Sequence, residues 1–304
     1  MVLGDNMSKV EDAVKYYGTN CAVNHLSFEV ADGEIFGLLG SNGAGKTTTF
    51  RMIMGLLDSN SGDITLNGKH INYDITDKIG FVTEERSLLT KLTVKEQVIY
   101  YGRLKGMTES DILKKLDMWL EKFKITEYKD RKIKELSKGN QQKIQFIAAV
   151  INEPVLLILD EPFTGLDPIN VKQLKDAIYE LKEKGTSIIF SSHQMEHIEE
   201  FCEKLVILVK GKTVLSGYLK DIKKDFRKKN IFIRGDVDTK DLEKIDGVIS
   251  VSTNNDEIMV KITDESVVEK VFKKISNKKI TKFVVEEATL NEIFIDKVGE
   301  AYDE

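Results

Sequence analysis

An eight-residue segment rich in glycine, residues 40–47, constrains the fold of this chain more than any other part of the sequence. It reads Gly-Ser-Asn-Gly-Ala-Gly-Lys-Thr, follows an apolar run at 35–39 and precedes a helical pattern at 47–57. Farther along, apolar strand patterns alternate with helical ones, which is typical of a parallel sheet covered by helices. We therefore predict an α/β fold in which this segment joins a central strand to a covering helix.

The same segment matches the pattern G-x-x-x-x-G-K-[ST] at every fixed position. Glycines let backbone N–H groups converge on phosphate oxygens, and the following helix directs its positive end at the same charge. We expect Lys46 to bridge the terminal phosphates of ATP and the Thr47 hydroxyl to contact Mg²⁺. The other nucleotide-binding residues predicted here are Ser41, Asn42, Gly43, Ala44, Gly45 and Thr48.

A second apolar run, residues 155–159, ends in two adjacent acids, Asp160 and Glu161. A buried strand that ends in a carboxylate places Asp160 beside the glycine segment, where it can hold the Mg²⁺ shell. Glu161 can then face the γ-phosphate and polarise water as the catalytic acid residue. Two adjacent acids at a strand end are also compatible with solvent-exposed side chains that have no catalytic role. Their occurrence together with the phosphate-binding pattern favours an ATP-hydrolysing enzyme.

Residues 136–142, Leu-Ser-Lys-Gly-Asn-Gln-Gln, resemble the signature motif of ABC ATPases and lie just upstream of the acidic strand. The resemblance implies that Ser137 and Gly139 contact the γ-phosphate held by a second ATPase subunit, so that two subunits enclose two ATP molecules. Lys138 stands where a glycine is usual, and Asn140 where glutamine is usual. The Lys138 side chain either brings positive charge near the nucleotide or points to solvent, and the sequence favours neither.

The resemblance assigns roles to further residues one at a time. His193 follows an apolar strand and two serines, and resembles the switch histidine that bonds the γ-phosphate and positions water. Asp167 resembles the residue that communicates across the dimer. Tyr17 resembles the aromatic that stacks on adenine, with Tyr16 as the alternative. Glu84 stands where a glutamine usually senses Mg²⁺ and touches the membrane partner, and a carboxylate can also ligate Mg²⁺.

Helical and strand patterns divide the chain into two predicted domains. Residues 1–219 resemble the ABC-type P-loop NTPase domain, with an all-helical insert at about 85–145. The basic run 220–230 is expected to be a linker or a solvated helix face. The strand and helix patterns of residues 231–304 predict a small α+β accessory domain. Its ending, Glu-Ala-Thr-Leu-Asn-Glu-Ile-Phe at 287–294, resembles that of a bacterial subgroup of exporters of sodium, drugs or peptides.

The amino-acid composition limits the kinds of partner that this chain can bind. Lys and Arg number 45 against 50 Asp and Glu, and the net charge of -5 argues against binding to a nucleic-acid backbone. The longest apolar run, 155–159, is far shorter than the roughly 20 residues that span a bilayer. We therefore expect a peripheral subunit at the cytoplasmic face of the membrane, coupled to a separate membrane-spanning permease. The distant Cys21 and Cys202 predict neither a zinc site nor a disulfide.

A soluble ABC-type ATPase that acts on a non-membrane partner is the alternative function. Ribosome-acting members of the family usually carry two nucleotide-binding cassettes, and this chain shows one copy of the phosphate pattern. DNA-acting members insert long coiled coils, for which the predicted helical insert is too short. These two comparisons favour the transporter subunit.

Overall fold

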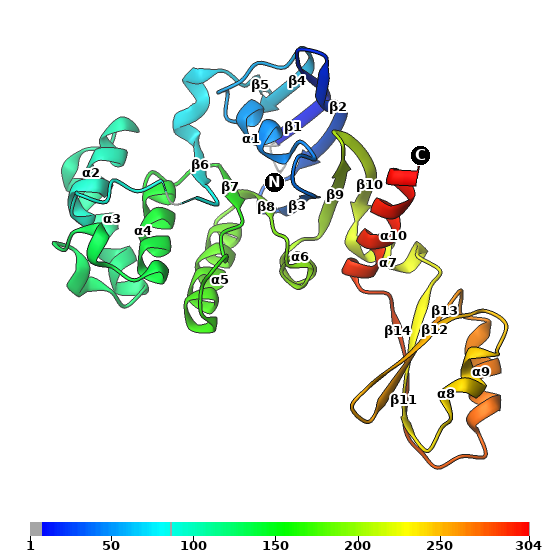
Figure 1. The fold of residues 1–304 in the computed structure, drawn as a ribbon. Helices are drawn as coiled ribbons and strands as arrows, with labels where there is room; N and C mark the ends of the chain where they lie inside the picture. The colour runs from blue at the N-terminus through cyan, green and yellow to red at the C-terminus, as the bar shows by residue number, and fades with distance from the viewer. Residues whose placement is uncertain (1–7, 86, 304) are drawn as a thin grey trace, which may run out of the picture. The chain divides into compact units, whose positions relative to one another are not determined.

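The computed structural model describes residues 8–85 and 87–303, and the chain divides after Ser216 into two compact units (Figure 1). The larger unit contains two β-sheets with helices packed on them. The smaller unit contains one four-stranded sheet with its own helices. This architecture confirms the prediction of an α/β protein followed by a small α+β unit.

A six-stranded sheet with the order β10-β9-β3-β8-β7-β6 forms the centre of the larger unit. The edge strand β10 spans Lys212–Tyr218. Strands β3, β7 and β8 are buried along their whole length, as expected for parallel strands covered on both faces. The strands that pair in parallel are β3 (Ile35–Gly40), β6 (Ile79–Val82), β7 (Leu156–Asp160), β8 (Ser187–Ser191) and β9 (Lys204–Val209).

Helix α1 (Lys46–Ile53) packs between this sheet and a second, four-stranded sheet. One hydrophobic core joins Phe50 of α1, Leu26 of the second sheet and Ile189 of β8. The next residue of β8, Phe190, points to the opposite face, where its ring stacks on Phe201 at 5.4 Å. The second sheet has the order β2-β1-β4-β5, with β1 (Ser8–Tyr17), β2 (Asn20–Val30), β4 (Ser61–Leu66) and β5 (Lys69–His70).

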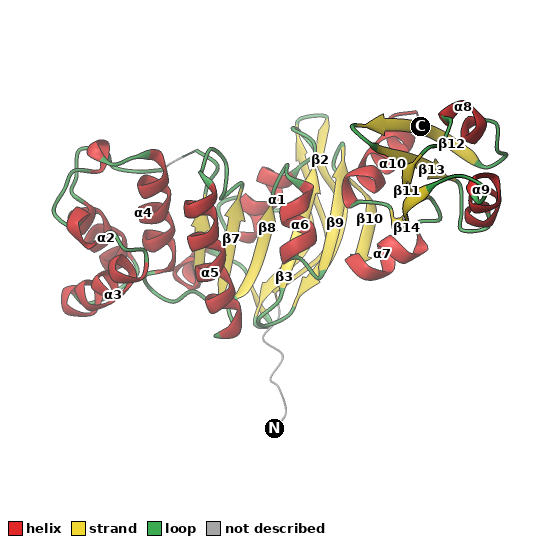
Figure 2. Ribbon diagram, turned by 90° about the horizontal axis from the view of Figure 1, so that it is seen from below, coloured by secondary structure: helices red, strands yellow, loops and turns green. Residues whose placement is uncertain are grey.

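Helices α5 (Pro168–Glu183) and α6 (Met195–Phe201) cover that opposite face of the central sheet (Figure 2). Their rings meet where Tyr179 of α5 stacks on Phe201 of α6 at 4.8 Å. Phe163, in the loop after β7, tilts against both Phe190 and Phe201. This aromatic cluster fixes the loop that follows the two acids.

Three helices gather at one side of the larger unit, in the region predicted to be a helical insert (Figure 1). Thr93 caps the first of them in a capping box with Glu96. Trp119 is buried against the rings of Phe123 and Phe146, both 5.7 Å away, and belongs to the core of this helical region. The elements of this region are α2 (Val94–Leu104), α3 (Glu109–Lys122) and α4 (Lys138–Val150), with 3₁₀ segments η2 (Thr126–Tyr128) and η3 (Ile133–Glu135); η1 (Tyr73–Lys78) precedes β6.

The smaller unit follows the order β-α-β-β-α-β, with strands arranged as β12-β13-β11-β14, which is a ferredoxin-like topology. Residues 220–230, where a linker or solvated helix face is expected, contain α7 and the start of β11. The elements are α7 (Leu219–Asp225), β11 (Lys229–Gly235), α8 (Thr239–Glu243), β12 (Val248–Asn254), β13 (Glu257–Ile262), α9 (Val267–Ile275), β14 (Ile280–Glu287) and α10 (Leu290–Asp303).

Glu292 anchors α10 to the sheet of the smaller unit. Its Oε2 accepts hydrogen bonds from Thr289 N at 3.0 Å and Asn230 Nδ2 at 2.7 Å, and its Oε1 lies 2.7 Å from Lys261 Nζ. Thr289 Oγ1 in turn accepts from Glu292 N at 3.3 Å, which completes a capping box. Burial raises the pKa of Glu292, but Lys261 and these donors together hold it below its usual value.

Replacing Glu292 with Gln removes the charge while it keeps the side-chain size. We expect the smaller unit to lose about 1.5–3 kcal/mol of unfolding free energy at neutral pH, the usual range for hydrogen bonds to charged groups. Because the folded pKa is lowered, this stabilisation exists above the unfolded pKa and disappears as the pH falls through the folded pKa. Hydrogen exchange of the amides of β11 and β13, measured at two pH values, checks both expectations.

The matched control is Glu286→Gln, on an exposed position of β14 in the same unit. Equal exchange in the two variants would contradict the anchoring role of Glu292.

Candidate functional site

The glycine segment joins β3 to α1 at the edge of the sheet where the parallel strands end. Gly45 caps α1 with a left-handed backbone, φ 109°, and a Cβ there would lie 2.4 Å from the carbonyl oxygen of Ala22. Both observations require glycine at this position. The loop therefore packs directly against the beginning of β2, and the first N–H groups of α1 point to the space beside it.

A polar cleft of about 620 Å³ lies beside this loop, a size suited to a small-molecule ligand. The segments that line the cleft are far apart in the sequence of the larger unit. Among the residues predicted from the sequence, the cleft brings together Tyr17, Ser41, Asn42, Gly43, Gly45, Lys46, Thr47, Thr48, Glu84, Asp160, Glu161 and His193. Tyr16, the alternative to Tyr17, does not line the cleft, and its N–H donates to Asn60 Oδ1.

Lys46 extends over the glycine loop. Its Nζ donates to the carbonyl oxygens of Gly40 at 2.6 Å and Ser41 at 3.3 Å. Burial lowers the pKa of the Lys46 ammonium, and the charges of Asp160 and Glu161 oppose that effect. The lysine is thus a partly desolvated cation, which favours binding of an anionic ligand, whereas its acidic neighbours favour a ligand that is accompanied by a cation.

Asp160 and Glu161 are buried at the end of β7. Ser191 Oγ, on the neighbouring strand, donates to Asp160 Oδ1 at 2.6 Å. Burial raises the pKa of Asp160, while Ser191 and Lys46 act in the opposite direction. Burial, followed by the negative charge of Asp160, raises the pKa of Glu161 to about 7. A carboxyl that titrates near neutral pH is well matched to general base catalysis.

Glu161 is held in a strained backbone conformation, with φ 50° for a residue that has a side chain. Its Oε2 accepts from Ser192 Oγ at 3.4 Å and Thr164 Oγ1 at 3.5 Å. Its Oε1 lies 3.5 Å from His193 Nε2 and has no hydrogen-bond partner among the described residues. A buried carboxylate oxygen without a partner, beside a half-exposed histidine, is ready to accept a proton from a third group in the cleft.

The residues of the cleft fit a magnesium nucleotide. A Cβ at Gly40 or Gly45 would clash with the carbonyl oxygen of Leu208 or Ala22, so glycine at both positions lets the loop keep its backbone beside Lys46. Converging backbone N–H groups of such a loop bind phosphate. Thr47, Asp160 and Glu84 contribute oxygen donors, the ligands that Mg²⁺ prefers. The described residues contain no cluster of three or more His, Cys, Asp and Glu side chains that could hold a metal alone. Such a site needs phosphate and water oxygens to complete it.

Four predicted residues lie outside the cleft lining of their own chain. Ala44 is buried behind the loop, where its N–H donates to Ser41 O at 3.1 Å. Ser137 and Gly139 begin α4, and Ser137 Oγ accepts from Asn140 N at 3.3 Å. Asp167 caps α5 by accepting from the N–H groups of its first turn. Lys138, at the first turn of α4, is exposed.

Sequence reasoning missed four residues that line the cleft. Asn20, Cys21 and Ala22 belong to the turn and strand that follow Tyr17. Because the stacking aromatic was already assigned there, proximity in the sequence could have identified them. Lys210 lies in the turn between β9 and β10 and carries no sequence signal, since its position depends on the pairing of distant strands.

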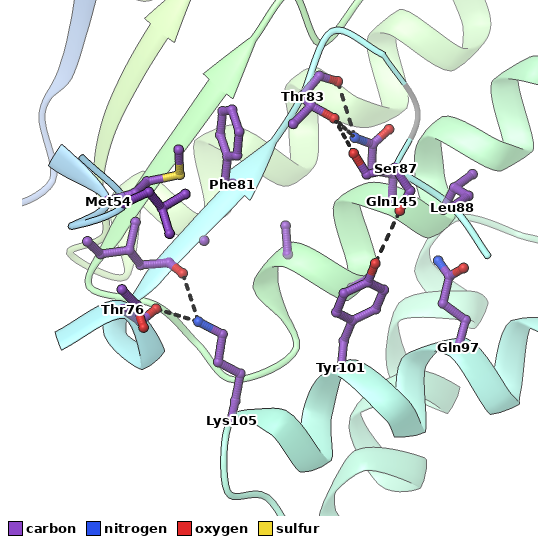
Figure 3. Close-up of a pocket in the computed structure, with 15 residues that line it drawn as sticks. Met54, Thr76, Phe81, Thr83, Ser87, Leu88, Gln97, Tyr101, Lys105 and Gln145 are labelled. Carbon is purple, nitrogen blue, oxygen red and sulfur yellow. Dashed lines mark hydrogen bonds between the residues drawn. The ribbon is translucent and has the colours of Figure 1, made fainter. Parts of the chain in front are cut away.

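A second cavity of about 280 Å³, here called the groove, lies where β6 meets α2 and α4 (Figure 3). Its lining is mostly apolar and includes Leu56, Phe81 and Leu88. Lys105 Nζ donates to Ile79 O at 3.4 Å, and the Tyr101 hydroxyl donates to Ser87 O at 3.2 Å. These bonds tie α2 to the segment around β6.

Among the described residues, no helix has the length and apolar content needed to cross a membrane. A family model described as ABC transporter matches residues 23–164, and a model described as ATP-binding protein DrrA1-3-like, C-terminal domain, matches residues 217–298.

Individual relatives agree with the ABC transporter model. The chain is 49% identical to the uncharacterized ABC transporter ATP-binding protein YhaQ of Bacillus subtilis, over 98% of this chain and all of that protein. It is 36% identical to the linearmycin resistance ATP-binding protein LnrL of the same organism, over 71% of this chain and 70% of that protein. A solved ATP-binding subunit of an ABC transporter superimposes with a TM-score of 0.68 at 32% identity, covering 72% of this chain and 93% of that chain.

The cleft, the fold and these relatives together confirm the resemblance seen in the sequence: the chain belongs to the ATP-binding proteins of ABC transporters, and it is an ATPase.

Proposed function

We propose that this chain is the ATP-hydrolysing subunit of a membrane exporter, located at the cytoplasmic face of the membrane. The observation that carries the proposal is the meeting of Lys46, Asp160 and Glu161 beside the glycine loop in one cleft. Family membership supports the coupling of this ATPase to a permease.

Each group in the cleft has a distinct task in hydrolysis. Lys46 and the backbone N–H groups of the loop bind the β- and γ-phosphates. Glu161 accepts a proton from the attacking water, whose oxygen bonds to the γ-phosphorus as the bond to ADP breaks. His193 orients that water and the γ-phosphate. Mg²⁺, when bound by Thr47, Asp160 and Glu84, supplies positive charge that neutralises the developing charge on the phosphates.

A second ATPase subunit completes each site in this proposal. Ser137 and Gly139 lie at the start of α4, and Asp167 lies at the start of α5, outside the cleft of their own chain. The N-terminus of a 13-residue helix is suited to contact a phosphate that a partner holds. Two chains arranged head to tail would place these residues at each other's nucleotide.

The groove is the proposed docking face for the permease. It is largely apolar, and Leu56 at its rim is 60% exposed, a side chain that a partner would cover. Thr83 lines the groove and Glu84 lines the nucleotide cleft, so adjacent residues connect the two cavities. A permease segment seated in the groove would therefore be coupled to the hydrolytic site.

Two comparisons support export of ions, drugs or peptides as the transport function. LnrL is named for linearmycin resistance, and the C-terminal residues match the DrrA1-3-like domain model. A soluble ATPase that acts on another kind of partner would fail the membrane test given below.

Glu161→Gln removes the proposed base without changing the side-chain length. We expect the hydrolysis rate to fall about 10²- to 10⁴-fold, the usual contribution of a general base, while nucleotide binding persists. Phosphate release and equilibrium nucleotide binding by the purified chain measure the two effects. The exposed Glu153→Gln serves as control, because Glu153 forms a surface ion pair with Lys115. Hydrolysis at the wild-type rate in Glu161→Gln would remove Glu161 from this role.

The raised pKa of Glu161 predicts a pH dependence. The base must be ionised, and its pKa of about 7 in the free protein leaves it mostly protonated at lower pH. We expect kcat/KM to fall about tenfold for each pH unit below that value and to level off above it. Nucleotide binding by Glu161→Gln over the same pH range corrects for titration of the nucleotide. A flat profile from about pH 6 to 8 would contradict the assignment.

Leu56→Glu places a charge at the rim of the groove. We expect this variant to be lost from detergent-solubilised membranes of the native cell, in which the wild-type chain co-purifies with a membrane protein. Met118→Glu is the control, because Met118 is also exposed, at 46%, and does not line the groove. Retained ATPase activity of isolated Leu56→Glu verifies its fold. Recovery of the wild type without any membrane protein would favour a soluble partner.

A further inference from the structure

Two neighbouring residues after β6 line different cavities. Thr83 lines the groove, and Glu84 lines the nucleotide cleft with Lys46 and Glu161. Consecutive Cα atoms are about 3.8 Å apart across a trans peptide, so a displacement of Thr83 must move Glu84. Whatever holds Thr83 therefore affects the position of the Glu84 carboxylate.

Gln145 of α4 holds Thr83. Its Nε2 donates to Thr83 Oγ1 at 2.8 Å and to Thr83 O at 3.2 Å, and Figure 3 shows the Gln145 amide directed at Thr83. The Gln145 side chain is 5% exposed, so water does not compete with these bonds. Thr83 Oγ1 also pairs with Ser87 Oγ at 3.0 Å. The turn that carries Glu84 is thus fixed at Thr83 by a buried amide from a distant helix.

The same helix carries the signature residues. Gln145 lies eight residues after Ser137, which corresponds to about 12 Å along α4. Helix α4 is continuous from Lys138 to Val150, so it moves as one body. A shift of the signature end toward a partner subunit would be transmitted to Thr83 through the Gln145 amide.

The remaining oxygen of the Gln145 amide is unsatisfied. Gln145 Oε1 is buried and has no hydrogen-bond partner among the described residues. A buried acceptor without a partner is rare in native structures. The hydrogen bonds of the Gln145 amide therefore all run from its nitrogen to Thr83.

We propose that Gln145 is a positioning residue for the ATPase reaction: it fixes Thr83 to the signature helix and thereby sets the position of Glu84. The inference rests on the metal-binding role of Glu84 given under the proposed function. It adds a physical connection between the groove, the signature helix and the Mg²⁺ side of the cleft.

Gln145→Met tests the connection, because Met is unbranched and of similar size but donates no hydrogen bond. Two quantities are measured on the purified full chain. The first is hydrogen exchange at the amides of residues 83–85, without nucleotide. The second is the Mg²⁺ concentration that gives half-maximal ATPase activity. We expect exchange to accelerate at least tenfold and the Mg²⁺ requirement to rise at least fivefold.

A double-mutant cycle with Glu84→Ala shows whether Gln145 acts through Glu84. We expect Glu84→Ala alone, which removes the side-chain oxygens, to raise the Mg²⁺ requirement, and Gln145→Met to add less than twofold in that background. Thr83→Val removes the hydroxyl that accepts from Gln145, together with its bonds to Glu85 O and Ser87 Oγ. It is expected to change both quantities in the same direction as Gln145→Met, and it covers the case in which Gln145→Met does not fold.

Gln97→Met is the matched control. Gln97 is a fully buried amide that lines the same groove, and its Oε1 accepts from Leu89 N at 2.7 Å instead of contacting Thr83. Faster exchange at residues 83–85 in this control would show a general loosening of the groove and overturn the proposal.

Other outcomes separate the inference from the function on which it rests. A normal Mg²⁺ requirement in Gln145→Met, with a raised one in Glu84→Ala, would overturn the inference alone. A full additional shift of Gln145→Met in the Glu84→Ala background would also overturn it. An unchanged Mg²⁺ requirement in Glu84→Ala would remove the metal role of Glu84 and the inference together.

Discussion

Asp160 and Glu161 are buried and Lys46 is half-buried at one edge of the central sheet, and the fold of the larger unit holds the three charged groups together. Isolated buried charges are costly by several kcal/mol each, so each of these groups needs the others and the polar atoms around them. Ser191 on β8 holds Asp160, and the carbonyl oxygens of the glycine loop hold Lys46. The parallel order of β3, β8 and β7 is what brings these partners from distant parts of the chain to one place.

The local parts of the site could be predicted from the sequence. The glycine loop, the acidic strand end and the capping boxes depend on residues within one turn or strand, so their patterns survive in the linear sequence. The groove and its contacts could not be predicted, because Gln145 reaches Thr83 across 62 residues. Lys210 enters the cleft for the same reason, through the position of β9 beside β3. Strand order is set by tertiary packing, which no single segment encodes.

In the smaller unit, too, the local elements could be predicted from the sequence but their arrangement could not. Its alternating strands and helices are visible as patterns, whereas the ferredoxin-like strand order is not. The basic run 220–230 shows how a charge pattern can hide a helix. Several of its lysines belong to a short helix, α7, whose Leu219 and Ile222 are buried. The ending 287–294 is recognisable as a family trait in the sequence. Only the structure shows what these residues do: they form the capping box and the contacts of Glu292 with Asn230 and Lys261.

The bonds that Lys46 makes to the glycine loop have a consequence for ligand discrimination. The carbonyl oxygens of Gly40 and Ser41 solvate the ammonium of Lys46. An incoming molecule must replace two neutral oxygens, and it gains from doing so only when it carries concentrated negative charge. A nucleoside or a monophosphate ester compensates poorly for their loss, whereas a chain of phosphates presents several charged oxygens at once. These two carbonyl oxygens thus favour polyphosphates over weakly charged metabolites as ligands of Lys46.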